Sequence, residues 1–448
     1  MRAVRPDLPL ILVLIAAGVA LVLLPDRPGE PAAPDSTAPL PDVIEDFNAE
    51  PDPRLAECWF RLPADDSRPA DPSDLDAVVE QTSERVERLR GLRFEREVDA
   101  KLLDEVAFRA RLDEQLGKDL KPAQLRREGE VLAALGAIPP ETDLPGLVAE
   151  GLSSQIAGFY DPVTKQLAVP TTDELEAEDL LVLAHELEHA LVDQNIGLRK
   201  GAGDPTADRT LAYTAAAEGD ASLLMFRYGL AYALGAFVPA QDVPGGEELG
   251  TLPDYVERNL LFPYLEGMRL ACHRFLEGGN RAIDQLYAKP PASTAEVLFP
   301  ERYGEGAPER VELPRRPGPG WTSVIHRELG AAELEWLLQA PGGDPEAGLP
   351  ETRELVYGWA GGELELWERD EERALAIALA ERPGSDRLCA AVGAWYRATR
   401  PEAAVERGTE EVELEFTEPG RAAVLSCAGN EVRLGVAPDP ATASRLAM

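Results

Sequence analysis

The chain has 448 residues, 44% of them apolar and 28% charged, which indicates a folded protein of two or three units and excludes disorder throughout. Its 81 acidic residues outnumber its 44 basic residues, so the formal net charge is −37. A charge of this sign repels phosphates, which argues against nucleic acid as a partner and against binding flat on an anionic lipid surface.

The N-terminal segment, residues 1–24, has the pattern of a membrane anchor. An uncharged apolar run from Leu8 to Leu24 follows Arg2 and Arg5. As a helix it would be roughly 25 Å long, close to the shortest length that crosses a bilayer. The basic flank is expected on the cytoplasmic side, so the rest of the chain should lie outside the cell membrane. The run ends without a small-x-small cleavage pattern, which favours an uncleaved single-pass anchor. A cleaved signal, which would give a secreted or periplasmic body, is the alternative.

Composition divides the rest of the chain into three regions. Residues 25–72 are rich in proline and acidic residues and are expected to form an extended tether. Residues 73–313 are expected to form a mostly helical unit, and residues 314–448 a C-terminal α+β domain. The boundary is placed at Pro314–Gly320, which is dense in proline, glycine and arginine.

Apolar periodicity and turn residues predict the elements of the two folded units. In the first unit we expect, in chain order, helices over 73–135 with a short strand at 93–98, a helix at 143–152, a β-hairpin at 156–169, and helices at 171–195, 208–235, 265–276 and 280–287. In the second we expect helices near 331–339 and 351–359, strands at 363–367 and 374–380, a helix near 386–397, a strand at 411–416, and a hairpin of 422–427 with 431–436. The predicted fold class is α+β.

The four cysteines are Cys58, Cys272, Cys389 and Cys427. They form no C-x-x-C pair, so a cysteine zinc site is not expected. In an oxidising compartment they can form two disulfides, in three possible pairings. Cys389 with Cys427 is the first candidate because both lie in the last segment, and four buried thiols are the alternative.

The sequence His185-Glu186-Leu187-Glu188-His189 is an H-E-x-x-H motif on a predicted helix. Histidines four residues apart lie on one helix face, so both imidazoles can bind one metal ion. Glu186 lies roughly 100° around the helix from His185, where it can take a proton from a water held by the metal. Zinc is the expected ion because this motif binds it. The alternative, a solvated acidic helix face, conflicts with the apolar residues on both sides of the motif.

A third protein ligand is required, with one position left open for water. Val192 and Asn195 exclude the H-E-x-x-H-x-x-G-x-x-H spacing. The best candidate is Glu218, 29 residues after His189, in a helical stretch of small residues that can approach the first helix closely. The alternative for Glu218 is an ordinary glutamate on a helix surface.

A zinc peptidase needs further supporting groups. Asp193 and Asp220 are candidates for orienting a histidine ring, or else are plain surface or capping charges. The hairpin Ile156–Val169 is a candidate edge strand for aligning a substrate backbone. Tyr264 and His273 are candidate donors to the oxyanion, with a packing role as the alternative for each.

Several of these segments resemble a group of exported, gluzincin-type metallopeptidase-like proteins. The segments that carry the resemblance are Gly158–Pro162, His185–Gln194, Glu218–Ala221, Pro290–Glu296 and Phe299–Tyr303, with a weaker likeness at Gly358–Gly362. The resemblance covers roughly residues 75–436, and the helix with the H-E-x-x-H motif is its most specific part.

The resemblance implies a zincin-like catalytic fold. It also implies roles for four residues: His185, His189 and Glu218 as metal ligands, and Glu186 as the catalytic base. Val192 and Phe299 stand where the resemblance implies glutamine and histidine.

These features predict zinc-dependent, endopeptidase-like hydrolysis of a protein or peptide substrate outside the cytoplasmic membrane. One alternative is a zinc-containing binding or assembly module that cuts nothing. Another is a zinc hydrolase that acts on a non-peptide bond. The sequence indicates neither the substrate preference nor the oligomeric state.

Overall fold

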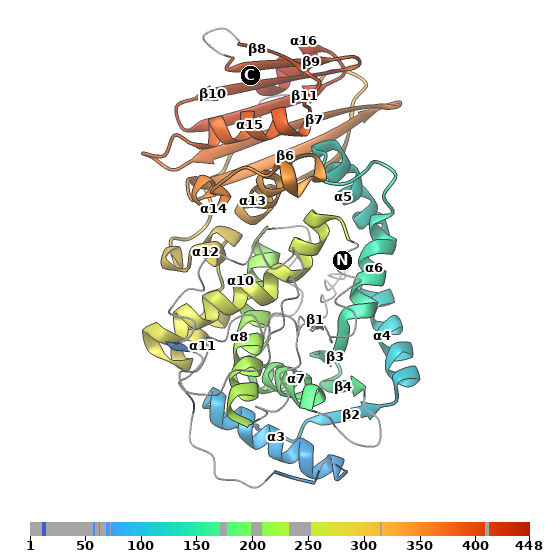
Figure 1. Cartoon of the computed structure of the whole chain (residues 1–448), viewed down its shortest axis with the longest axis vertical. Helices are drawn as coiled ribbons and strands as arrows, with labels where there is room; N and C mark the ends of the chain where they lie inside the picture. Colours follow the sequence, from blue (N-terminus) through green and yellow to red (C-terminus); the bar gives the residue numbers. More distant parts are fainter. Residues whose placement is uncertain are drawn as a thin grey trace, which may run out of the picture.

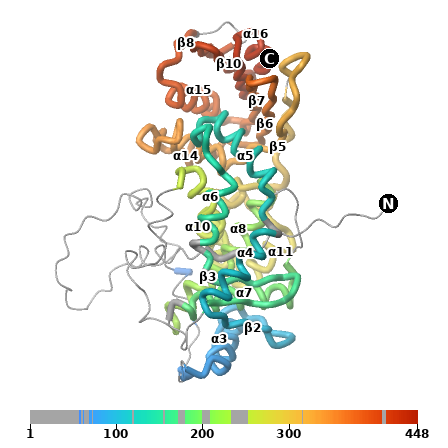
Figure 2. The backbone as a smooth tube through the Cα atoms, turned by 90° about the vertical axis from the view of Figure 1, so that its right-hand side faces the viewer, coloured from blue at the N-terminus to red at the C-terminus, as the bar shows by residue number. Residues whose placement is uncertain are grey.

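The computed structural model of the chain describes residues 11–14, 57–58, 62, 69–71, 73–170, 177–198, 208–232, 252–313, 316–407 and 412–448. Helices and strands are both abundant, and the fold class is α+β, as predicted. The molecule is elongated, with helices in its lower part and a large sheet at its upper end (Figure 1). Figure 2, turned by 90°, shows the same division, with the C-terminal sheet at one end of the helical part.

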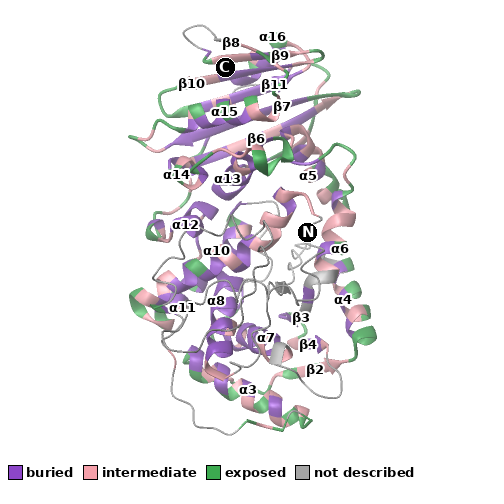
Figure 3. Cartoon of the chain, viewed as in Figure 1, coloured by how far each residue is buried: buried purple, intermediate pink, exposed green. Residues whose placement is uncertain are grey.

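The helical part is built on two long helices that cross each other. Its helices are α3 (Leu75–Arg90), α4 (Glu105–Asp119), α5 (Pro122–Leu135), α6 (Leu144–Gln155), α7 (Ala177–Asn195), α8 (Asp208–Tyr232), α10 (Asp254–Gly278), α11 (Asn280–Ala288) and α12 (Thr294–Leu298). Helices α8 and α10 have 25 residues each and pack against each other. Helix α8 is buried along almost its whole length, as Figure 3 shows, so it lies in the core of this part.

Two glycines allow α8 and α10 to touch backbone to backbone. A Cβ atom at Gly267 of α10 would lie 2.1 Å from the carbonyl oxygen of Ala215 in α8. A Cβ atom at Gly219 of α8 would lie 2.0 Å from the carbonyl carbon of Gly267. Such distances are far below van der Waals contact, so any other residue at either position would push the two helices apart.

A small sheet lies against α7, which contacts both strands of its central hairpin. The sheet has the order β1-β3-β4-β2, with strands β1 (Ile11–Leu14), β3 (Ile156–Asp161), β4 (Gln166–Pro170) and β2 (Asp99–Leu103). Strands β3 and β4 form the predicted antiparallel hairpin. The side chain of Asp161 accepts hydrogen bonds from the amide of Val163 and the hydroxyl of Thr164, which fixes the turn between them.

The C-terminal part is a seven-stranded antiparallel sheet with helices packed on it. Its strand order is β5-β6-β7-β11-β10-β9-β8, with β5 (Thr322–Glu328), β6 (Trp359–Arg369), β7 (Glu372–Glu381), β8 (Ala404–Arg407), β9 (Leu414–Glu418), β10 (Arg421–Ala428) and β11 (Glu431–Ala437). Its helices are α13 (Ala331–Gln339), α14 (Thr352–Val356), α15 (Leu388–Thr399) and α16 (Pro440–Ala447), with short 3₁₀ turns η3 (Pro300–Arg302), η4 (Pro341–Gly343) and η5 (Pro345–Ala347) near the junction.

A disulfide between Cys389 and Cys427 joins α15 to β10, which confirms the first candidate pairing. Cys58 and Cys272 are both buried.

The helical part and the C-terminal sheet share one hydrophobic core, which includes residues on both sides of the predicted boundary. Two arginines, the buried Arg327 and the half-buried Arg353, strengthen this junction. Arg327 of β5 pairs with Glu128 of α5, and Arg353 of α14 pairs with Glu266 of α10 at 2.7 Å. The predicted boundary begins at residues 314–315, which lie outside the described residues.

Most predicted elements are present, with changed limits. The helix at 331–339 and the strand pairs of the C-terminal sheet are confirmed. The predicted helix 265–276 is only the last half of α10, which begins at Asp254 and continues through Pro263. The predicted ends of the helices at 171–195 and 208–235, namely residues 171–176 and 233–235, lie outside the described residues.

Two of the predictions from local pattern are wrong. The short strand expected at 93–98 forms instead at Asp99–Leu103, because that segment pairs in parallel with β4. The helix expected at 351–359 ends at Val356, because Trp359 already begins β6 and pairs with Glu381. In both places tertiary pairing decides the outcome over local propensity.

Four residues of the predicted membrane anchor, Ile11–Leu14, form strand β1, and the rest of residues 1–24 lies outside the described residues. Among the helices formed by the described residues, none combines the length and the apolar composition that a bilayer crossing requires.

Candidate metal centre

The three predicted metal ligands meet at one point in the helical part. His185 and His189 lie one turn apart on α7, and Glu218 lies on the neighbouring helix α8. The Nε2 atoms of the two histidines are 3.1 Å apart. The Oε2 atom of Glu218 is 3.2 Å from Nε2 of His185 and 3.5 Å from Nε2 of His189. Helix α8 thus brings Glu218 next to the two histidines of α7, the arrangement that the sequence predicts.

The spacing of these three atoms fits a tetrahedral metal ion. Zinc–nitrogen and zinc–oxygen bonds of about 2.0–2.2 Å place neighbouring ligand atoms of a tetrahedron about 3.3 Å apart. The three measured distances lie on both sides of this value. Two imidazoles and a carboxylate from two helices, with the fourth corner left for another ligand, are a donor set that suits zinc.

Both histidines are fully buried and neutral. Burial lowers the pKa of His185 to about 4, although its hydrogen bond with Glu218 acts in the opposite direction. Burial likewise lowers the pKa of His189 to about 3. A neutral imidazole has a free lone pair, so both rings are in the form that binds a metal ion at neutral pH.

The predicted base, Glu186, is also fully buried and lies beside the ligands. Burial, with the charge of Glu218 nearby, raises the pKa of Glu186 well above its ordinary value. A divalent cation between the ligands would lower this pKa again. Gly158 of β3 lies directly over this side chain, because a Cβ atom there would meet Val182 at 2.5 Å and the Cγ atom of Glu186 at 3.4 Å.

The buried charges around the ligands are strongly unequal. Four carboxylates, each at most 1% exposed, lie in this region: Glu186, Glu188, Glu218 and Asp220. Arg90 pairs with Glu188 and Asp220, and the buried Arg227 lies near enough to Asp220 for an electrostatic interaction. Burying uncompensated carboxylates is costly. A divalent cation at the ligand triangle would supply two of the missing positive charges.

Some polar atoms of the cluster have no hydrogen-bond partner within the described part of the chain. They include the Nδ1 atoms of both histidines and the Oε1 atom of Glu218. Buried polar atoms are normally satisfied, so the unpartnered oxygen of Glu218 is an independent sign that the site holds a ligand, whereas the two Nδ1 atoms lie on the far side of the rings from the ligand triangle.

The two predicted supporting aspartates have different partners. Asp220 faces Arg90 and accepts a hydrogen bond from the hydroxyl of Tyr287 at 2.9 Å. Asp193 accepts a hydrogen bond from the hydroxyl of Tyr160 at 2.7 Å and pairs with Lys165, so it fastens the hairpin to α7. Neither aspartate makes a hydrogen bond to a ring of the two ligand histidines.

The structure separates the two candidate oxyanion donors. Tyr264 of α10 is 9% exposed, and its ring centroid lies 6.4 Å from that of His185. His273 lies more than two turns further along α10, where its Nδ1 atom is 3.8 Å from Glu277. Tyr264 therefore remains a candidate for the site, and the contact of His273 is with a partly exposed glutamate of its own helix.

The expectation that the hairpin offers an edge strand is wrong. Strand β3 is covered on its outer side by β1, with Ile11 opposite Tyr160, and β4 is covered by β2. The edges of this sheet are β1 and β2. A peptide aligned along β3 would therefore have to take the place of β1.

Sequence reasoning missed two residues of the cluster. Glu188 occupies a position that the H-E-x-x-H pattern leaves unspecified, yet it is 0% exposed and its Oε2 atom lies 3.6 Å from Nδ1 of His189. Arg90 belongs to the first helix of the unit, 95 residues before His185, and its sequence neighbours give no sign of a link to the motif. Only the packing of α3 on α7 and α8 brings it there.

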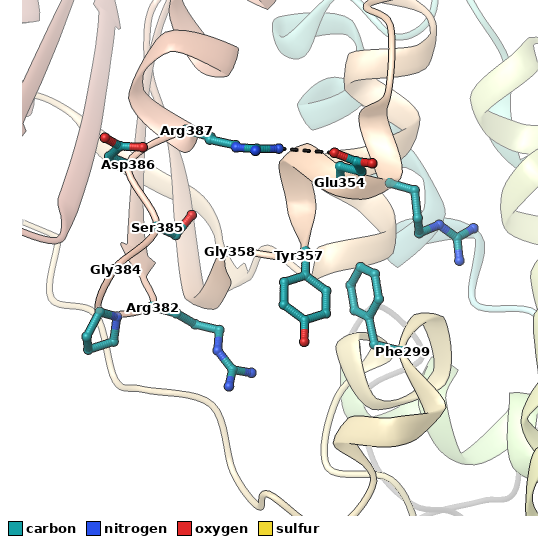
Figure 4. A pocket seen from close by; sticks show the side chains of 11 residues that line it. Phe299, Glu354, Tyr357, Gly358, Arg382, Gly384, Ser385, Asp386 and Arg387 are labelled. Carbon is teal, nitrogen blue, oxygen red and sulfur yellow. Dashed lines mark hydrogen bonds and ion pairs between the residues drawn. The ribbon is translucent and has the colours of Figure 1, made fainter.

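A separate cavity of about 570 Å³ lies where the helical part meets the C-terminal sheet (Figure 4). Its lining includes the three arginines Arg353, Arg382 and Arg387, each of which pairs with a glutamate of the chain. Phe299 and Tyr357 form an edge-to-face ring pair in it, with centroids 4.9 Å apart. Phe299, which stands where the resemblance implies histidine, thus packs at the junction.

Comparison with known proteins gives no match: no protein-family model, no curated protein and no solved structure is significantly similar to this chain. The resemblance to gluzincin-type metallopeptidases stays a prediction, and the site has to be interpreted from its own geometry.

Proposed function

We propose that the chain is a zinc-dependent peptidase with a zincin-like catalytic unit of the gluzincin type. The observation that carries the proposal is the convergence of three buried ligand atoms, from His185, His189 and Glu218, within 3.1 to 3.5 Å of one another, with Glu186 beside them. The substrate would be a protein or peptide. The body would act outside the cytoplasmic membrane.

The donor set fits zinc better than magnesium or calcium, which prefer oxygen ligands. When bound, zinc supplies a Lewis acid that polarises a carbonyl group and lowers the pKa of a coordinated water towards neutrality. His185, His189 and Glu218 would hold the ion. The surplus of buried carboxylates around these ligands gives the site a strong electrostatic preference for a cation of charge two.

The remaining residues have roles that follow from their positions. Glu186 would accept a proton from the attacking water and later donate one to the leaving amine. Tyr264, whose ring centroid lies 6.4 Å from that of His185, is the candidate donor to the carbonyl oxygen as negative charge develops there. The close approach of Gly158 leaves no room for a larger residue over the base, because an added Cβ atom would meet Val182 at 2.5 Å.

The proposal is tested by zinc analysis combined with a proteolysis assay. The purified full-length chain is incubated with a mixed peptide library, with and without a chelator, and cleavage is followed by mass spectrometry. We expect close to one zinc per chain and hydrolysis that the chelator stops and added zinc restores. Glu186→Gln should keep the zinc and lower kcat by at least about 100-fold, the range for a general base.

A matched control is Glu381→Gln. Glu381 is 4% exposed, as buried as a catalytic glutamate, but it lies in the C-terminal sheet and accepts hydrogen bonds from the start of α15. This variant should keep its activity. Tyr264→Phe in the same panel should keep zinc and lose kcat.

The outcomes distinguish the alternatives. Hydrolysis that survives in Glu186→Gln would remove Glu186 as the base. Zinc binding without cleavage of any peptide would favour a binding or assembly module, and chelator-sensitive cleavage of esters alone would favour a hydrolase of non-peptide bonds.

A further inference from the structure

We propose that Arg90 is a positioning residue for the metal centre, which sets the spacing between the two ligand helices and orients His189 through Glu188. The inference rests on the proposed metal centre and adds a residue that the motif does not contain. Arg90 is 2% exposed, and its guanidinium group pairs with Glu188 and Asp220, which are close in sequence to the proposed ligands His189 and Glu218.

The backbone of Arg90 is held in place by the end of its own helix and by a neighbouring helix. Arg90 is the last residue of α3, which ends at Gly91 with a φ of 73°. The side-chain amide of Asn280, at the start of α11, donates to the carbonyl oxygens of Leu89 and Arg90 at 3.0 and 2.6 Å. The end of α3 is therefore tied to α11, and the Arg90 side chain extends from a fixed point.

The guanidinium group connects three different helices. It donates to Asp220 of α8 at 3.0 and 3.2 Å, and it pairs with Glu188 of α7 at 3.4 Å and with Asp284 of α11 at 2.7 Å. Glu188 is next to the ligand His189, and Asp220 is two residues after the ligand Glu218. Arg90 thus holds together the two helix segments whose separation sets the distance from the histidines to Glu218.

Glu188 gives Arg90 a direct route to one ligand. The Nε2 atom of His189 faces the other ligand atoms, so its Nδ1 atom points away from them. A metal-bound histidine normally donates this second nitrogen to a carboxylate or carbonyl, which fixes the ring. The Oε2 atom of Glu188 is 3.6 Å from Nδ1 of His189, while its Oε1 atom faces Arg90. Glu188 thus lies between Arg90 and His189 without a hydrogen bond to either, and its ion pair with Arg90 keeps near the ring the carboxylate that would orient it.

The test measures zinc affinity, which does not depend on catalysis. The purified full-length chain is titrated with zinc in competition with a chromogenic chelator. Arg90→Met should raise the zinc Kd by about 10- to 100-fold, the usual effect of losing a partner of a ligand. Arg90→Lys should fall between this variant and the wild type, because one ammonium group cannot serve three carboxylates. Cobalt bound in place of zinc should show a changed visible absorption in Arg90→Met, since the ligand geometry changes.

The matched control is Arg327→Met. Arg327 is also buried, at 7% exposed, and pairs with two glutamates, but it lies at the junction with the C-terminal sheet. It should lower the melting temperature and leave the zinc Kd and the cobalt spectrum unchanged. A merely structural Arg90 would behave in the same way as this control.

An Arg90→Met protein that folds and binds zinc with the wild-type Kd would overturn the proposal. If that variant does not fold, Arg90→Lys and Glu188→Gln decide, and an unchanged Kd in both would overturn it. A wild-type chain that binds no zinc would overturn both this proposal and the metal centre. A wild type that binds zinc, loses affinity in Arg90→Met and cleaves nothing would support the role of Arg90 and remove the peptidase proposal.

Discussion

The two buried arginine clusters, around Arg90 and around Arg327, differ in how completely their polar atoms are satisfied. Every guanidinium nitrogen of Arg327 donates to Glu128 or Glu333, and all four carboxylate oxygens of these glutamates accept a bond from it. Around Arg90, one guanidinium group serves a region with four buried carboxylates. The polar atoms of the first cluster are fully paired, and the second has more buried carboxyl groups than Arg90 can pair.

The difference separates a structural ion pair from a site that needs a ligand. Both clusters contain a buried arginine, so burial of charge alone does not mark function. The cluster around Arg90 differs because its surplus carboxyl groups lie beside two neutral histidines. The Nε2 atoms of these histidines face the Oε2 atom of Glu218. A cluster of this composition is stabilised by a cation, and the one around Arg327 is not.

The largest effect is expected from removing a ligand. Glu218→Ala should abolish zinc binding at micromolar zinc. Losing a residue that binds the metal directly should weaken zinc affinity by more than the roughly 100-fold that losing a hydrogen-bond partner of a ligand costs. The zinc content after dialysis, measured by mass spectrometry, checks this. If the variant retained stoichiometric zinc, Glu218 would not be a ligand. The cluster around Arg90 would then no longer differ from the cluster around Arg327 in needing a cation.

The next effect is on stability and concerns the complete cluster. Glu333→Ala leaves Arg327 partly unpaired and should lower the free energy of unfolding by about 3–5 kcal/mol, the usual cost of breaking a buried ion pair. Denaturant unfolding of the zinc-free chain measures it. Zinc affinity should be unchanged in this variant, and a large change would mean that the two clusters are coupled.

The smallest effect is a pH dependence at a second ion pair of the junction. Against the effect of burial, Arg353 and Arg269 lower the pKa of Glu266 to about 2 from 4.5. A lowered pKa means that the unfolded chain binds the proton more tightly, so the stabilisation is complete above about pH 4.5 and is lost as the pH falls towards 2. The shift corresponds to about 3 kcal/mol. Between pH 5 and 3 the free energy of unfolding should fall less steeply with falling pH in Glu266→Gln than in the wild type. Equal slopes in the two proteins would contradict the role of the Glu266 carboxylate.

The sequence was sufficient for those parts of the site that lie on regular helices. His185, Glu186 and His189 follow from a spacing of four on one helix, and Glu218 follows from a carboxylate in a helical stretch of small residues. The spacing of residues on a helix is fixed by its geometry, so it can be predicted from the chain alone. The hairpin before the motif was predicted for a similar reason, because Asp161 fixes the turn locally.

What the sequence could not supply are contacts between distant segments. Arg90 reaches the cluster through the packing of α3, and β2 forms at residues 99–103 because β4 provides its partner. The pairing of β1 with β3 likewise covers the edge that the hairpin was expected to offer. Each of these depends on a contact whose partner is far away in the chain, which no local pattern encodes.

The contact between Gly219 and Gly267 has a consequence for the interpretation of mutational data. Because the residue after the proposed ligand Glu218 touches the opposing helix through main-chain atoms, no side chain there can repack to absorb a change. In a saturation mutagenesis screen both glycines should therefore score as intolerant as the proposed metal ligands. Neither has a positive φ or a functional side chain, so a screen interpreted only in terms of turns and chemistry would misclassify them.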